Sequence, residues 1–320
     1  GHDPQLLKKT EKQEIKDTGT YTFEKVASEW LGSRKGRSAD ATIEDYRNKL
    51  ENQILPTFAK LSIKRITRPE CIAFMRSHEK RAPEQARKLL MVMRMVFEYA
   101  IDMDWMEDSN PARSSKNTTT NHSSKSLPSL KDWNLVPPFL VAVTENKCRG
   151  EYQTNIAVKL AALTFVRASS LVSARWVDID FDNKLWTIPA DKMKGKREHI
   201  TPMSDPVIEL FMKLKQINGD EEYCFYSPRG KKYPYLNPSS PNHHIKNLGG
   251  EFEGKLVTHG LRAMAMTHGQ EVLKTEYQII DLQLAHMQGN KIRQAYDRAQ
   301  FMPERREFMD RWSKLLIENG

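Results

Sequence analysis

Residues 114–126 of this chain read SSKNTTTNHSSKS, and no side chain in this stretch is apolar. A segment of this composition cannot bury a hydrophobic core and is typical of a flexible linker. Apolar residues recur on both sides of it, so the chain of 320 residues cannot fold around one core that runs through this point. The sequence therefore predicts two domains, residues 21–113 and 127–320, joined by this linker.

Residues 1–20 are polar and charged, and they begin without a methionine. A stretch with so few apolar residues predicts a charged tail that joins neither core. We expect its first residues to be a remnant of cloning, and the natural protein to begin earlier.

The first domain has the pattern of a small helical bundle. Apolar residues at helical spacing indicate its first helix, namely Phe23, Val26, Ala27, Trp30 and Leu31. We expect further helices over residues 41–55, ending before Pro56, over residues 67–78 behind a capping box, and over residues 83–103. This pattern predicts a four-helix domain with Arg and Lys on its outer faces.

The second domain combines helices with one hairpin. An apolar helix is predicted over residues 152–166, and two strands over residues 184–189 and 199–203 enclose the basic turn ADKMKGKRE. A helix with Ser204 as its cap is expected over residues 204–217, and helices return toward the C-terminus. The predicted fold class is mainly α with a small antiparallel sheet.

The composition points to an anionic partner. The formal net charge is +9, which favours nucleic acid. The three cysteines are far apart and outside any C-x-x-C pair, so they indicate neither a zinc site nor disulfides and fit a reducing cytoplasm. No apolar run approaches the ~18 residues of a membrane span, and no Gly-rich phosphate loop implies ATP.

The stretch THGLRAMAMTH, residues 258–268, has the features of an anion site at a helix start. Thr258 is a favourable N-cap, and free backbone N–H groups gather at that end of a helix. His259 and Arg262 are three residues apart and are expected to share one helix face. Such a helix end binds anions readily, although a pair of this kind is more often solvated surface.

Further polar residues follow a definite order along the second domain. Arg167 comes after the apolar helix, basic residues follow in the turn between the two strands, and His286 precedes Tyr296 by ten residues. Each is weak evidence alone. Together with His-x-x-Arg at Arg262, the order resembles the tyrosine recombinases, the phage integrase family. The resemblance covers about residues 20–315 and is closest to the integrases of prophages and genomic islands.

This resemblance implies a reaction in which a tyrosine oxygen attacks a DNA phosphodiester. A covalent 3′-phosphotyrosine forms and a 5′-hydroxyl leaves, with Tyr296 at the position of the nucleophile. Arg167 and Arg262 match the pair whose planar guanidiniums grip the charged phosphate oxygens. His259 and His286 match residues that donate hydrogen bonds or assist proton transfer. No metal or other cofactor is implied, because the arginines supply the positive charge.

The proton donor to the leaving 5′ oxygen is expected on the turn between the two strands. Lys194 matches this position best by its distance from the end of the second strand, and Lys192 and Lys196 stay open because turn lengths vary. Ser170 departs from the family pattern, which commonly has Glu there, at a position thought to support the site. Leu261 replaces a frequent Phe.

The resemblance also implies partners and a place of action. Double-stranded DNA attachment sites in the bacterial nucleoid are the expected substrate, bound by a homotetramer on two sites, with a DNA-bending protein and an excisionase as further partners. Full-length relatives carry an N-terminal arm-binding domain that this sequence lacks, so we expect a truncated form. The first domain would be the core-binding domain, and the tail after Tyr296 would dock in cis or on a neighbouring protomer.

Two other functions share parts of this pattern. A type IB topoisomerase uses the same chemistry as a monomer, and the separate first domain and tail helix argue against it. A DNA-binding module without catalysis would not require all six matched residues. The hypothesis favoured by the sequence is therefore a site-specific recombinase that integrates and excises a mobile element.

Overall fold

The computed structural model describes residues 21–107, 109–113, 126–193, 195–228, 233–286 and 300–319. The chain divides into two compact units, residues 1–124 and 125–320. The predicted tail over residues 1–20 and all of the predicted linker except Ser126 lie outside the described residues. Each unit has a hydrophobic core of its own.

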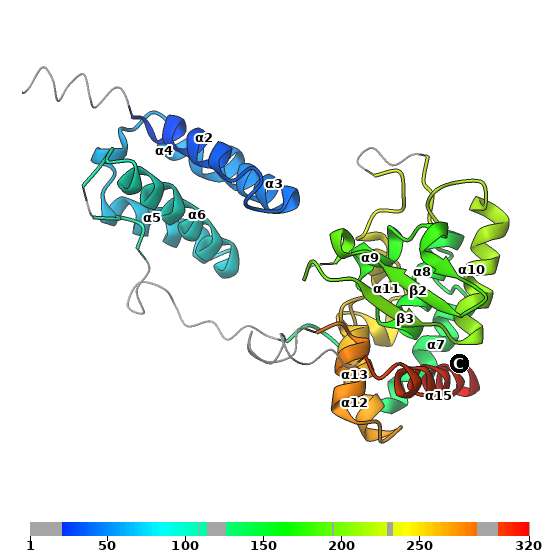
Figure 1. The fold of residues 1–320 in the computed structure, drawn as a ribbon. Helices are drawn as coiled ribbons and strands as arrows, with labels where there is room; N and C mark the ends of the chain where they lie inside the picture. The colour runs from blue at the N-terminus through cyan, green and yellow to red at the C-terminus, as the bar shows by residue number, and fades with distance from the viewer. Residues whose placement is uncertain are drawn as a thin grey trace, which may run out of the picture. The chain divides into compact units, whose positions relative to one another are not determined.

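The regular elements in the described part of the first unit are helices, and one isolated bridge joins Thr22 to Ser62 (Figure 1). Its α-helices are α2 (Phe23–Ser33), α3 (Asp40–Lys49), α4 (Leu55–Phe58), α5 (Arg68–Glu79) and α6 (Pro83–Asp102). The five apolar residues of the predicted first helix are the buried residues of α2, which confirms that prediction. The predicted capping box is confirmed too, because the Thr67 N–H donates to Glu70 Oε2 at 2.7 Å before α5.

The expectation that a helix ends before Pro56 is wrong. A π-helical turn, Leu50–Ile54, continues α3 directly into α4, and Pro56 lies inside α4. Pro56 occupies the first turn of α4, where its missing N–H is not needed for the helical hydrogen bonds. The helix therefore continues past Pro56, after a turn in which its hydrogen bonds change from the α to the π pattern.

The second unit holds the sheet and most of the helices. Its α-helices are α7 (Val136–Thr144), α8 (Tyr152–Thr164), α9 (Ala168–Val172), α10 (Asp205–Asn218), α11 (Ser240–Asn247), α12 (Gly260–Glu271), α13 (Tyr277–Gln283) and α15 (Met302–Asn319). The strands are β1 (Ile179–Asp180), β2 (Leu185–Ile188) and β3 (His199–Pro202). The predicted class, mainly α with a small antiparallel sheet, is confirmed.

The sheet has the order β1-β2-β3, and both pairs are antiparallel. Thr187 pairs with Ile200 and Ile188 with His199, so the predicted hairpin is confirmed. The sequence pattern missed β1, which is only two residues long and too short to show an alternation of apolar and polar residues. The basic turn ADKMKGKRE therefore connects the end of β2 to the start of β3.

Helix α15 packs within its own unit, against α7, α8, α13 and β3 (Figure 1). Its apolar face is buried there, with Phe308, Trp312 and Leu316 all covered. The indole Nε1 of Trp312 donates to the carbonyl of Ala162 in α8 at 3.0 Å. Buried aromatic side chains dominate such contacts, so this face accounts for much of the attachment of α15.

Ser204 is the N-cap residue of α10 as predicted, but its hydroxyl does not cap the helix. The hydroxyl is buried and lies 2.6 Å from the hydroxyl of Ser313 on α15. This contact ties α10 to the C-terminal helix. No helix in the described part of the chain is long and apolar enough to cross a bilayer.

Candidate active site

Arg262 is the centre of a cluster of charged side chains in the second unit. It lies on α12 with 5% of its surface exposed. Its Nη2 donates to the carbonyl of Leu284 at 2.5 Å, and its Nη1 donates to the carbonyl of Phe165. Phe165 is the C-cap of α8 and Leu284 the C-cap of α13. The guanidinium therefore neutralises two helix C-termini, where the helix dipole favours a cation.

Arg167 is held beside Arg262 by the local path of the chain. Phe165 ends α8 in the left-handed conformation, at φ 60°, and Arg167 then becomes the N-cap residue of α9. Burial lowers the pKa of the half-buried Arg167. Burial and the charge of Arg167 lower the pKa of Arg262 to about 9. An anion bound between two guanidiniums that repel each other would be stabilised by both of their charges.

The buried carboxylate of Asp281 orients His286. Oδ1 of Asp281 lies 2.9 Å from Nδ1 of His286 and accepts a hydrogen bond from the Tyr277 hydroxyl at 3.3 Å. An acceptor at Nδ1 fixes the proton there, so the other ring nitrogen, Nε2, is the one left for a substrate. Asp281 also raises the pKa of Arg262, against the effects of burial and Arg167. Sequence reasoning missed this residue.

The start of α12 differs from the predicted arrangement. Thr258 does not cap the helix, since its hydroxyl is buried and has no hydrogen-bond partner among the described residues. The N-cap position belongs to His259, which is exposed, whereas Arg262 is buried. Gly260 follows because a Cβ there would lie 2.0 Å from the Pro128 carbonyl oxygen. Close packing against the chain before α7 therefore sets where this helix begins.

The turn after β2 is attached to α9 through Ser170. The buried Ser170 hydroxyl donates to the carbonyl of Lys192 at 2.8 Å. Ser170 stands where the resemblance predicts Glu, and this bond lets a neutral side chain hold the turn. Lys192 is half-buried and Lys196 is exposed. Lys194 and Tyr296 lie outside the described residues.

Arg305, Gln283 and His199 are three further polar residues of this unit, and His199 feels the charges of both arginines. Arg305 of α15 is 3% exposed, and its Nη2 donates to Gln283 Oε1 at 2.8 Å and to the Ile200 carbonyl at 2.6 Å. It therefore joins α15 to α13 and β3. His199 of β3 faces this cluster, and its Nε2 is buried without a hydrogen-bond partner among the described residues. No sequence pattern had singled these residues out, since their burial arises only through the tertiary fold.

Burial, and then the charges of Arg305, Arg262 and Arg167, lower the pKa of His199 to about 3. Its unfolded value is about 6.5, so below that pH the unfolded chain binds a proton that the folded chain does not. Stability should therefore fall as the pH drops from 6.5 toward 3. At pH 5 the loss due to His199 is up to about 2 kcal/mol.

We expect His199→Gln to remove this part of the acid sensitivity. Urea unfolding of the second unit at pH 7 and pH 5 measures it, as the difference between the two free energies of unfolding. The matched control is His243→Gln, which replaces an exposed imidazole and should leave that difference unchanged. If His199→Gln shows the same loss at pH 5 as the unaltered chain, the imidazole is not held neutral by this cluster.

Comparison with known proteins places this arrangement in a family. The model of the phage integrase family matches residues 138–301, and that of the phage integrase central domain matches residues 23–117. The integrase of Enterobacteria phage P4 is 32% identical over 338 residues, covering 100% of this chain and 74% of that protein. The chain belongs to the phage integrase family. It is a tyrosine recombinase, as the order of its polar residues had indicated.

Other integrases are also similar to this chain. Prophage integrase IntA of Escherichia coli (strain K12) is 29% identical over 316 residues, covering 98% of this chain and 74% of the relative. A lambda integrase dimer bound to a COC′ core site has a TM-score of 0.65 at 17% identity, covering 83% of this chain and 96% of that one. The Tn1549 transposon integrase in complex with circular intermediate DNA has a TM-score of 0.60 at 15% identity, covering 90% and 99%. At these identities the two structures support the fold of this phage integrase.

Proposed function

We propose that this integrase cleaves and rejoins DNA attachment sites with Tyr296 as its nucleophile. The phenolic oxygen of Tyr296 forms a bond to the phosphorus, the bond from phosphorus to the 5′ oxygen breaks, and a 3′-phosphotyrosine and a free 5′-hydroxyl result. The reverse reaction, with a 5′-hydroxyl from another strand, gives a recombined duplex. The phosphotyrosine retains the energy of the broken phosphodiester, so the strands can be rejoined without a further reactant.

The observation that carries this proposal is the buried guanidinium of Arg262 in a phage integrase, together with the neighbouring charge of Arg167, which lowers its pKa. Charge builds on the non-bridging oxygens during phosphoryl transfer, and guanidiniums bind such oxygens through paired hydrogen bonds. Arg262 lacks a partner at Nε among the described residues, and its donors at Nη are shared with helix ends. A bound phosphate also offsets the repulsion between the two arginines.

The two histidines are proposed to complete the donor set. Asp281 holds His286 so that Nε2 is directed away from the carboxylate. His259, at the N-terminus of α12, would add a second donor where backbone N–H groups already favour an anion. Both would bind phosphate oxygens or take part in moving the phenol proton.

Lys194 is proposed to donate a proton to the leaving 5′ oxygen. We expect Lys194→Ala to slow cleavage of an ordinary duplex by a factor of at least ~10², the size of a strong general-acid effect. A substrate with sulfur in place of the 5′-bridging oxygen should restore the rate, because a thiolate leaves without a proton. Cleavage rates on the two substrates measure this.

Lys192→Ala and Lys196→Ala are the matched controls from the same turn. Neither should be rescued selectively by sulfur. Selective rescue of one of them, with none for Lys194→Ala, would move the acid to that lysine.

Duplex DNA is the proposed partner, with four copies of the chain on two attachment sites. Among solved relatives are a lambda integrase tetramer bound to a Holliday junction and a lambda integrase dimer bound to a COC′ core site. We propose that the first unit and the second unit both contact phosphates, that a DNA-bending protein and an excisionase assist, and that the reaction takes place on bacterial nucleoid DNA.

The test is to trap the covalent intermediate. An attachment-site duplex with a nick beside the cleavage position loses a short strand after cleavage, so rejoining stops and adduct accumulates. Denaturing electrophoresis and peptide mapping should find the DNA on Tyr296. Absence of adduct, or its presence on another residue, would contradict the proposal.

A further inference from the structure

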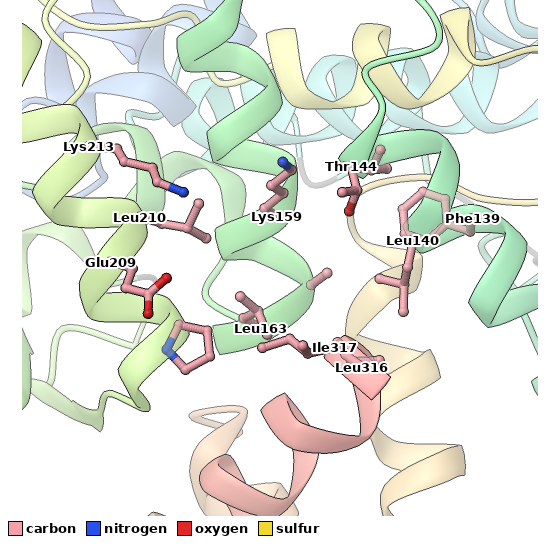
Figure 2. Close-up of a pocket in the computed structure, with 13 residues that line it drawn as sticks. Phe139, Leu140, Thr144, Lys159, Leu163, Glu209, Leu210, Lys213, Leu316 and Ile317 are labelled. Carbon is pink, nitrogen blue, oxygen red and sulfur yellow. The ribbon is translucent and has the colours of Figure 1, made fainter. Parts of the chain in front are cut away.

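A cavity lies in the second unit, among α7, α8, α10 and the end of α15 (Figure 2). It has a volume of about 230 Å³ and is partly open to solvent. Its walls are mostly aliphatic and aromatic: Phe139, Leu140, Val143, Ala162, Leu163, Pro206, Leu210, Leu316 and Ile317. None of these residues belongs to the cluster around Arg262, so the cavity is a separate feature of the catalytic unit.

Two lysines line the same cavity. Figure 2 shows the ammonium groups of Lys159 and Lys213 toward one end, with Leu163, Leu316 and Ile317 toward the other. Lys159 is half-buried. Burial and the charge of Lys213 lower the pKa of Lys159. The cavity therefore has a cationic end and an apolar end.

Among the residues that the structure describes, the half-buried Lys159 and the exposed Lys213 are not held in ion pairs. Glu209 lines the cavity one helical turn before Lys213 but forms no ion pair with it in this part of the chain. A half-buried ammonium without a counter-charge is costly, and a second ammonium beside it adds repulsion. An anion at this point would offset both costs.

We propose that this cavity binds an aliphatic carboxylate, with the carboxylate between Lys159 and Lys213 and the hydrocarbon chain against the apolar wall. The charge pair selects an anion, and the wall selects an apolar body. A fully polar anion such as inorganic phosphate would leave the apolar wall unfilled. A neutral hydrocarbon would leave the two ammonium groups without a partner.

Calorimetric titration of the whole chain, residues 1–320, with decanoate tests this site. Saturable binding is expected, and octanoate should bind about fifteenfold more weakly, because it has two fewer methylenes and each buried methylene contributes roughly a factor of four in affinity. Decanol, which has the same chain without charge, should bind at least tenfold more weakly than decanoate. Equal affinity of decanol and decanoate, or no saturable binding of decanoate, would overturn the proposal.

Variants locate the site. Lys159→Met keeps an apolar stem of similar length and should weaken decanoate binding at least tenfold, while Lys246→Met, an exposed lysine on α11, should not change it. Leu140→Trp should block binding by filling the cavity, with thermal unfolding as the check that it folds. Unchanged affinity in Lys159→Met would place the bound decanoate elsewhere and refute the site.

Another occupant would give a different result. If a second copy of the chain filled the cavity, Leu140→Trp would shift the elution volume in size-exclusion chromatography, and decanoate would not bind. That outcome would also overturn the proposal. None of these measurements depends on DNA cleavage, so they stand apart from the proposed recombinase chemistry.

Discussion

Tyr296→Phe should bind duplex DNA like the unaltered chain and form no covalent adduct with it. The substitution removes one oxygen, which is the atom proposed to attack phosphorus, and leaves the ring and the charge of the chain unchanged. Since affinity for DNA comes mainly from contacts between cationic side chains and phosphates, the dissociation constant should stay within about twofold. Trapping on a nicked duplex and a binding titration measure the two properties.

Tyr152→Phe is the matched control for this loss. Tyr152 is 51% exposed at the start of α8, and its replacement should leave adduct formation unchanged. Adduct at the normal level in Tyr296→Phe would exclude Tyr296 as the nucleophile. Loss of both binding and adduct would assign the residue to binding instead.

Arg167→Ala should slow strand cleavage by a factor of at least ~10², comparable to the loss of one strong donor to a transition state. Its effect on folding should be small. The Arg167 guanidinium is only half-buried, and it makes no hydrogen bond or ion pair with any described residue. Single-turnover cleavage rates and urea unfolding, measured on the same protein, separate the two effects.

Arg262→Ala gives the informative contrast. It should slow cleavage to a similar degree and also lower the free energy of unfolding by about 2 kcal/mol or more, because it leaves the Phe165 and Leu284 carbonyls without their donor. Arg167→Lys should recover little activity, since an ammonium cannot make the paired contacts of a guanidinium. Near-normal cleavage by Arg167→Ala or Arg167→Lys would refute the proposed role of that arginine.

The parts of the fold that local pattern determines were predictable. The buried side of α2 follows from apolar residues three and four apart, and the start of α5 from the pairing of Thr67 with Glu70. The hairpin of β2 and β3 follows from two short apolar runs around a basic turn. Each of these elements is specified by residues that are close to one another in the sequence.

The arrangement of the site could be predicted only in part. The order of Arg167, Arg262 and His286 identified the family, but their burial depends on residues far apart in the chain. A single Asp on a helix, such as Asp281, is usually solvated, and nothing near it in the sequence indicates that it faces His286. In the same way, His199 on a short strand gives no sign that three arginines surround it.

The way Arg262 binds the ends of α8 and α13 affects how inactive forms of this enzyme should be prepared. Reagents that capture an integrase on its substrate before cleavage must keep the protein folded at the temperatures used for imaging or crystallisation. A change at Arg262 removes the donor that joins three helices, so any lost recombination would mix weaker chemistry with a less stable fold. Changes at Tyr296 or Arg167 avoid that mixture, and they are the better starting points for trapping assembled complexes.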